Sequence, residues 1–150
     1  MMQEAGGKGQ ERAMAYQEWL ATVPDDLKQD SLWQFNVYPK AVFLYDLLWE
    51  DCECLMKDVR GRAIAEQIIR SGGSIGTNTE EGFGRGFGAE YGYFMRVAIG
   101  SARETRGWYY RARRLLKPEV LQHRLSLLDE VIGSLVKAAG HQKHLSQSKR

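Results

Sequence analysis

Cysteine and histidine are scarce in this chain of 150 residues, which has two of the first and three of the second. Cys52 and Cys54 stand one residue apart in an apolar stretch, and no further ligand follows them at metal-site spacing. We therefore expect two reduced cysteines on a helix, with no metal and no cofactor. His123 is the only histidine before residue 141. Because neither an inward Glu-x-x-His pair nor a histidine near a candidate serine nucleophile is present, we predict no catalytic residues and no enzyme activity.

Long apolar runs are also absent. The longest stretches without a charge fall far short of a membrane span, and the first thirty residues hold no apolar core typical of a signal peptide. We therefore expect no membrane contact and a cytoplasmic location. No segment shows the period-two alternation of a half-buried strand, which argues against a sheet.

Seven of the sixteen glycines lie between Arg70 and Tyr91, where a phosphate-binding loop is the first interpretation to test. Gly84, Gly86 and Ala89 fit the relaxed dinucleotide pattern G-x-G-x-x-A. However, the preceding residues "RAIAEQIIRS" have helical spacing and supply no buried strand to present such a turn. No glycine is followed by Lys-Ser or Lys-Thr at P-loop spacing. The pattern therefore argues against nucleotide binding of either kind.

A helical period of apolar residues covers most of the chain after residue 36. It runs through four segments, at 38–56, 64–81, 89–115 and 118–139, with short links between them. In the first segment Trp49 and Met56 widen the apolar stripe, and Pro118 suits the first turn of the last helix. We predict an all-α fold, an antiparallel up-down-up-down four-helix bundle.

The bundle is predicted to occupy residues 37–140. Residues 1–36 are expected to form an N-terminal extension and linker, flexible at "GGKGQ" and partly helical at "ERAMAYQEWLAT". Gly140 is expected to end the last helix, so that residues 141–150 form a polar tail with His141 and His144 in solvent.

Small residues mark the second helix. The three glycines between residues 72 and 76 cost it roughly 3 kcal/mol in helix propensity relative to alanine. We expect a large neighbour such as Trp49 or Trp108 to lie across them and offset that cost. Asn78 falls on the core-facing line and needs a hydrogen-bond partner there. The following loop is expected at residues 82–88, whose glycines permit a positive φ.

A motif of the form R-x3-S-I-x2-N-x2-E-G-x-G-R precedes the helix "AIGSARETRGWYYRARRL". In this spacing the sequence resembles the four-helix-bundle family of proteins encoded in intervening sequences of bacterial 23S ribosomal RNA genes. The same family includes the accessory variability determinant of diversity-generating retroelements. The resemblance covers residues 35–139, and the motif positions are Arg70, Ser74, Ile75, Asn78, Glu81, Gly82, Gly84 and Arg85.

The resemblance implies a homo-oligomer, a pentamer in known members, without a catalytic centre. The retroelement members are basic, bind nucleic acid and the reverse transcriptase of the element, and are needed for mutagenic reverse transcription. The members of the ribosomal type have no assigned activity. The implied partners are therefore further copies of this chain, RNA or DNA, and a reverse transcriptase.

The charges of the third helix point to a polyanion. Between Phe94 and Lys117 the chain has seven basic residues and one acidic residue, Glu104, a local balance of +6. At about 100° per residue, all seven fall on the side away from the core. The planar donor fork of arginine suits phosphate, and acidic partners four residues away are nearly absent. We call these residues the basic stripe: Arg96, Arg103, Arg106, Arg111, Arg113, Arg114 and Lys117.

The first helix carries the opposite charge, −3 between residues 36 and 58. Either this helix neutralises the basic stripe across a subunit interface, or the stripe stays unpaired and binds a polyanion. We hypothesise a non-enzymatic, oligomeric nucleic-acid-binding protein, an accessory subunit to a retroelement reverse transcriptase in mutagenic retrohoming. The basic stripe and Arg85 are its candidate binding residues. The alternative is a self-assembling structural bundle of the ribosomal intervening-sequence type with no nucleic-acid role.

Overall fold

The computed structural model describes residues 15–86 and 88–148, and side chains as far as Gly140. Within these ranges all regular secondary structure is helical and no strand is present, which confirms the predicted all-α fold. The elements are a helical segment at 15–22, α2 (Asp25–Lys28), η1 (Ser31–Gln34), α3 (Val37–Leu55), α4 (Val59–Gly84), α5 (Ala89–Arg111), η2 (Arg113–Leu115) and α6 (Pro118–Ser148).

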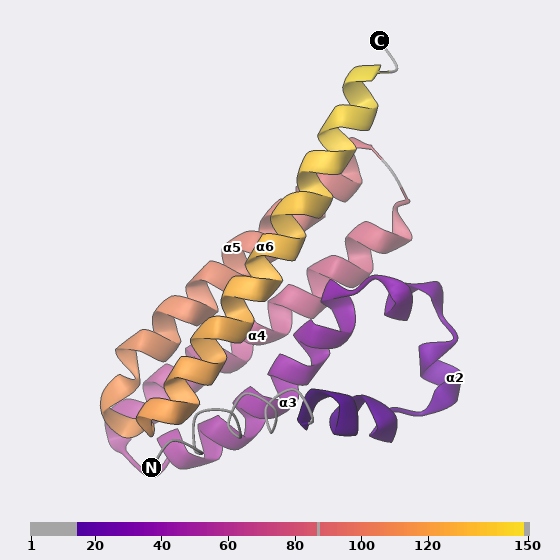
Figure 1. Ribbon diagram of the computed structural model, residues 1–150. Coiled ribbons are helices and arrows are strands. Elements are labelled where there is room, and N and C mark those ends of the chain that lie inside the picture. The colour runs from indigo at the N-terminus through magenta and orange to yellow at the C-terminus, as the bar shows by residue number, and fades with distance from the viewer. Residues whose placement is uncertain (1–14, 87, 149–150) are drawn as a thin grey trace, which may run out of the picture.

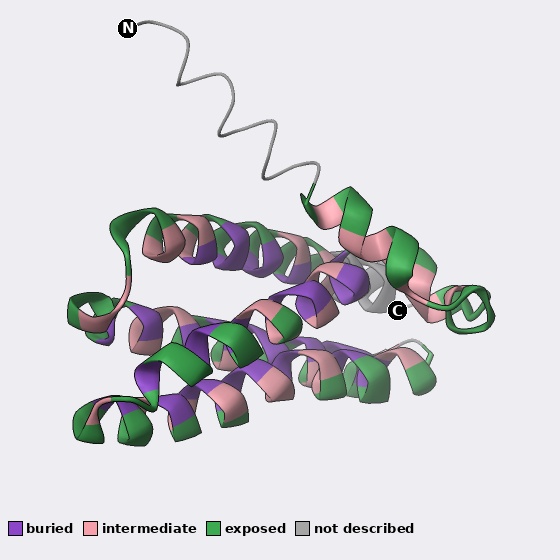
Figure 2. Cartoon of the chain, turned by 90° about the horizontal axis from the view of Figure 1, so that it is seen from below, coloured by how far each residue is buried: buried purple, intermediate pink, exposed green. Residues whose placement is uncertain are grey.

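The four long helices lie side by side and join at alternating ends, as Figure 1 shows. Helix α4 packs against α3 and α5, and α5 packs against α6, whereas α3 and α6 touch at fewer places. Buried residues line the inward faces of these helices (Figure 2). The predicted up-down-up-down bundle is therefore confirmed. Its fully buried large side chains include Leu44, Leu48, Leu55, Ile68, Ile75, Met95, Leu128 and Leu135.

Short local signals set the turns between the long helices. Asp58 caps α4, because its Oδ1 accepts hydrogen bonds from the N–H of Arg60 at 2.8 Å and of Gly61 at 3.2 Å. The turn from α4 to α5 has a positive φ at Gly86 (78°) and at Gly88 (97°), a conformation that other residues rarely adopt. These turns reverse the chain within a few residues, so successive helices are antiparallel neighbours.

The described part of the N-terminal extension packs on the bundle. Residues 15–22 are helical, as predicted, and the rings of Tyr16 and Trp19 each lie 5.3 Å from the ring of Phe43 on α3. Trp19 also donates a hydrogen bond from Nε1 to Asp46 Oδ2 at 2.6 Å. The segment therefore adds an aromatic layer to α3. The flexible lead predicted at residues 6–10 lies outside the described residues.

The glycines of α4 have other neighbours than the sequence predicted. A Cβ on Gly72 would lie 2.2 Å from Leu48 Cδ2 and 3.8 Å from Thr105 Cγ2, so a leucine and a threonine cover this glycine. Trp49 is instead 57% exposed, and Met56 is 45% exposed. The prediction that Trp49 or Trp108 lies across the glycines is wrong, because neither is among the nearest neighbours of a Cβ on these glycines. One helical step of about 100° past Leu48 turns Trp49 out of the core.

Two helices continue past their predicted ends. Helix α4 runs through Gly82 because this residue packs closely on α5: a Cβ there would lie 2.6 Å from Met95 Cε. Helix α6 passes Gly140 and ends at Ser148, since a glycine in a helical conformation costs about 1 kcal/mol and does not by itself end a helix. The side chains of His141 and His144 lie outside the described part of the chain.

Candidate nucleic-acid interface

The basic stripe faces away from the core on α5, on η2 and just before α6. Six of its seven cations are exposed, and Arg106 is half-buried. Arg106 reaches α6, where its Nη1 lies 2.5 Å from Asp129 Oδ1. No other member of the stripe forms an ion pair with a residue that the structure describes. Unpaired positive charge is therefore concentrated on one side of α5 and in the residues that follow it.

Arginines elsewhere in the described ranges have partners. Arg62 donates from Nε to the carbonyl oxygen of Met56 at 3.0 Å, and the others form ion pairs. The ion pairs are Arg60 with Asp58, Arg70 with Glu104, Arg85 with Glu81 and Glu90, and Arg124 with Asp51. In the basic stripe, by contrast, only Arg106 meets a carboxylate among the described residues, and Arg113 donates from Nη1 to the carbonyl oxygen of Tyr110 at 3.2 Å.

Two arginines of the stripe lie over aromatic rings. The guanidinium of Arg111 is 4.9 Å from the ring centroid of Trp108, and that of Arg113 is 4.5 Å from the ring centroid of Tyr110. A guanidinium that stacks on a ring keeps N–H donors at its edge, where an anion can approach. These contacts therefore orient the two arginines without neutralising them.

Arg85 has a different environment from the unpaired members of the stripe. It lies just after the end of α4, with Nη2 3.8 Å from Glu81 Oε2 and Nη1 3.9 Å from Glu90 Oε2. Its guanidinium also lies 5.9 Å from the ring centroid of Phe94. Its charge is thus met by two carboxylates at the α4–α5 turn.

Two motif residues, Ser74 and Asn78, belong to a polar seam between α4 and α5. Ser101 donates a hydrogen bond from Oγ to Ser74 Oγ at 2.8 Å, and Thr105 donates from Oγ1 to Ser71 Oγ at 2.9 Å. Asn78 donates from Nδ2 to the carbonyl oxygen and to Oγ of Ser74, both at 2.8 Å, which supplies the partner that its position requires. The hydroxyl groups of the seam therefore hold two helices together, and no hydrogen bond joins them to a histidine within the described ranges.

Other motif residues serve the same helix contact. Ile75 is fully buried. Arg70 bridges to α5, where its Nη2 lies 2.9 and 2.8 Å from the two carboxylate oxygens of Glu104. Gly82 has no side chain and so leaves room for the side chains of α5. Nothing in the structure explains why residue 84 is a glycine, since Gly84 has open space around it. Arg70, Ser74 and Gly82 of the motif thus contribute to the packing of α4 on α5.

A buried ion pair joins α3 to α6, and the sequence patterns did not predict it. Asp51 and Arg124 are 8% and 9% exposed, with Nε 2.7 Å from Oδ2 and Nη2 3.1 Å from Oδ1. Tyr109 donates from its hydroxyl to Asp51 Oδ2 at 2.7 Å. Burial and the Asp51 carboxylate raise the pKa of Tyr109 well above its usual value, so the phenol stays protonated. The sequence did contain one sign of this burial: Asp51 stands three residues after Leu48, a spacing that places both on the core-facing side of the helix.

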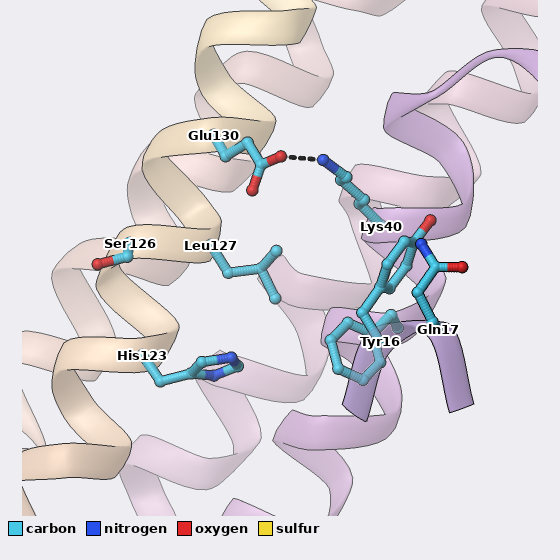
Figure 3. A pocket seen from close by; sticks show the side chains of 8 residues that line it. Tyr16, Gln17, Lys40, His123, Ser126, Leu127 and Glu130 are labelled. Atoms are coloured by element: carbon cyan, nitrogen blue, oxygen red, sulfur yellow. Dashed lines mark hydrogen bonds and ion pairs between the residues drawn. The ribbon is translucent and has the colours of Figure 1, made fainter. Parts of the chain in front are cut away.

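A separate cavity of about 370 Å³ lies between the N-terminal helical segment, α3 and α6 (Figure 3). Lys40 and Glu130 form an ion pair across it, and Tyr16 and Leu127 supply apolar surface. Its size suits a small molecule, since such sites measure about 300 to 1,000 Å³. None of the site residues predicted from the sequence lines it, and its two opposite charges already neutralise each other.

Cys52 lacks both the lowered pKa and the exposure of a reactive thiol. Burial, followed by the Asp51 carboxylate, raises the pKa of Cys52 to about 11, which keeps the thiol protonated at neutral pH. Among the residues that the structure describes, no three histidine, cysteine, aspartate or glutamate side chains converge as metal ligands. Of the helices within the described ranges, none combines the length and the apolar character needed to cross a membrane.

Comparison with known proteins agrees with this architecture. A protein of unknown function from the S23 ribosomal protein family of Bacteroides thetaiotaomicron has a similar fold, with a TM-score of 0.65 and 22% sequence identity over 69% of this chain and 95% of that chain. No curated protein sequence matches. The model of the 23S rRNA-intervening sequence proteins matches residues 34–137, from the end of η1 into α6. This confirms the ribosomal part of the predicted resemblance, and neither match names a retroelement protein. The chain belongs to the 23S rRNA-intervening sequence protein family.

Proposed function

We propose that this protein is a non-enzymatic helical bundle that binds nucleic-acid backbones through the basic stripe. The observation that carries the proposal is the set of six exposed cations with no acidic partner among the described residues. Like charges that lie close together repel each other, and Arg111, Arg113 and Arg114 follow one another at the end of α5 and in η2. A phosphate backbone offsets that repulsion and gains free energy by releasing counterions.

Binding of this kind depends on the charge of the nucleic acid more than on its base sequence. Arginine contacts to phosphate fix the position of a nucleic acid without distinguishing its bases. We therefore expect similar affinity for RNA and DNA of different sequences and a strong dependence on salt.

Fluorescence anisotropy with labelled RNA and DNA over a salt series tests the proposal. The change is Arg96→Gln with Arg103→Gln, because both side chains are exposed and neither forms an ion pair with a described residue. Removing two phosphate contacts should shallow the log-log salt slope by about 1.4 for single strands or about 1.8 for duplex. Arg106 is left intact, since its substitution would also break the contact of α5 with Asp129 on α6.

The matched control is Lys57→Gln with Lys137→Gln. These two lysines are exposed, lie outside α5 and form no ion pair with a described residue. The control removes the same charge, so an equal loss of affinity in both variants would mean that net charge and not the stripe governs binding. An unmodified protein that binds neither RNA nor DNA at about 50 mM salt would refute the proposal outright.

We also propose that the protein is a homo-oligomer, and the family resemblance makes a pentamer the specific expectation. Exposed apolar side chains on α3 and at the α3–α4 corner support this: Trp49 is 57%, Met56 45% and Val59 79% exposed. Apolar surface of this kind is typical of subunit contacts. Light scattering that gave a monomer of 17.1 kDa at micromolar concentration would contradict it.

The same surface favours a second candidate function, a structural bundle whose charged faces serve only assembly. Beside Trp49 on α3, the carboxylates of Glu50 and Glu53 are exposed and could meet the basic stripe of another copy. The Arg96→Gln, Arg103→Gln variant separates the two functions. Dissociation of this variant into monomers would assign the stripe to the subunit interface, whereas an unchanged mass with weaker RNA binding supports the first proposal.

A narrower form of the proposal makes the bundle an accessory subunit of a retroelement reverse transcriptase. Its support is the sequence resemblance, together with the basic character that the retroelement members share. Co-purification of the protein with a reverse transcriptase encoded beside its gene tests this role. A gene that lies inside a ribosomal RNA operon with no such neighbour would contradict it.

A further inference from the structure

Two tyrosines share the exposed face of α5 with arginines of the basic stripe. Tyr93 is 57% exposed and Tyr110 is 56% exposed. Tyr93, Arg96, Arg103 and Tyr110 follow one another at steps of three, seven and seven residues. These steps keep all four side chains within about 100° of arc and spread them over roughly 25 Å of helix. The two rings therefore bracket the two unpaired arginines.

Neither ring serves the bundle core. Two tyrosines that do are buried and donate their hydroxyls to carboxylates, Tyr38 to Glu80 and Tyr109 to Asp51, each at 2.7 Å. By contrast, the hydroxyls of Tyr93 and Tyr110 have no hydrogen bond with any described residue. Tyr110 carries the guanidinium of Arg113 over its ring, and more than half of its surface still faces solvent.

Tyr110 also borders a hollow of about 470 Å³ between α5 and α6. Arg103 and Arg106 line it from α5, and Asp129 lines it from α6. Arg106 holds Oδ1 of Asp129, and Oδ2 has no partner among the described residues. A carboxylate oxygen in this position can accept an N–H from the edge of a base. The hollow therefore offers a ring, a cation and an acceptor within the space of a nucleoside.

We propose that this face of α5 binds single-stranded nucleic acid, with bases stacked on Tyr93 and Tyr110 and phosphates held by Arg96 and Arg103. The inference rests on the proposed function, because it names the form of nucleic acid that the basic stripe takes. In a duplex the bases stack on each other and pair through their edges, so the two rings and Asp129 gain no contact. Aromatic rings set among cations are how proteins bind single strands without reading their sequence.

The test compares a labelled single-stranded RNA with a duplex of equal length over the same series of salt concentrations. The variant is Tyr93→Leu with Tyr110→Leu, which keeps apolar bulk and removes the rings. We expect its single-strand affinity to fall by about fivefold or more for each base that loses its ring. Its duplex affinity should stay within about twofold and its salt slope should not change, because the phosphate contacts remain. Tyr110→Phe with Tyr93→Phe should restore single-strand binding, since stacking needs only the ring.

The control is Leu27→Ala with Val136→Ala, which removes exposed apolar surface outside α5: these side chains are 54% and 46% exposed and lie on α2 and α6. All variants are compared by circular dichroism and light scattering to exclude unfolding or loss of assembly. Unchanged single-strand binding in the tyrosine variant, or a preference of the unmodified protein for duplex, would overturn this inference and leave the proposed function standing. Failure of the unmodified protein to bind either probe would instead remove the proposed function itself.

Discussion

Alanine at Gly61 should destabilise the protein although it raises helix propensity. Gly61 lies in the first turn of α4, beside the end of α3, and a Cβ there would lie 2.0 Å from the carbonyl oxygen of Leu55. Carbon and oxygen normally approach to about 3.3 Å, so the two helices must separate by roughly 1 Å or distort. Leu115 Cδ1, at 2.9 Å, can rotate away, but the carbonyl can move only with the backbone of α3.

The size of the effect follows from two opposing contributions. Alanine gains about 1 kcal/mol of helix propensity over glycine. Overpacking costs about 1 to 3 kcal/mol, and an overlap with backbone belongs at or above the upper end. We therefore expect Gly61→Ala to lower the free energy of unfolding by about 2 kcal/mol, which lowers Tm by roughly 4 to 8 °C in a chain of this size.

Gly76→Ala on the same helix is the control of opposite sign. A Cβ on Gly76 meets no atom within 4 Å, so only the propensity gain remains, and Tm should rise by roughly 1 to 4 °C. Both variants are melted by circular dichroism at one protein concentration, because assembly makes Tm depend on concentration. A Gly61→Ala protein that melts at or above the unmodified protein would show that the α3–α4 corner is not closely packed.

Three further predictions concern the buried ion pair and the two cysteines of α3. Asp51→Asn leaves the Arg124 charge buried without a counterion and should cost about 3 to 5 kcal/mol in urea unfolding, whereas Tyr109→Phe should cost about 1 kcal/mol; equal costs would contradict the ion pair. Iodoacetamide should alkylate the exposed Cys54 and not the buried Cys52, which mass spectrometry of the peptides can measure. Because the folded pKa of Cys52 is raised to about 11 from 9.0, its contribution to stability is intact below pH 9 and falls as pH rises toward 11, by up to about 1.4 kcal/mol per pH unit. Cys52→Ala should remove the loss between about pH 9 and 10, whereas the raised pKa of Tyr109 causes a further loss above about pH 10 that this variant keeps.

The helices were predictable because their signals are local. An apolar period of three and four residues needs only the chain itself, and it located α3 to within two residues of its ends. The neighbours of a given residue depend on how helices shift and rotate against each other, which the period does not encode. Glycine at position 72 thus predicted a close contact, but only the structure shows that Leu48 makes it.

The candidate site divides in the same way. The outward direction of the basic stripe follows from a step of about 100° per residue, and the structure exposes six of its seven members. The helical step does not predict which arginines form ion pairs. Arg106 meets Asp129 and Arg124 meets Asp51 across 23 and 73 positions of sequence, and both partners come from other helices. A count of the charges on one helix therefore overestimates how many of its arginines lack an ion-pair partner.

Tyr109 and Tyr110 show why the fold and the proposed binding surface can be changed separately. They are adjacent and chemically identical, yet Tyr109 is 0% exposed and bonded to Asp51, while Tyr110 is 56% exposed with no hydrogen bond from its hydroxyl to a described residue. One helical step places the first in the network that joins α5 to α3 and α6, and the second beside the basic stripe. Substitutions on the inner face of α5 should therefore change the free energy of unfolding. Substitutions on the outer face should change affinity for nucleic acid, because that face contributes little to the core.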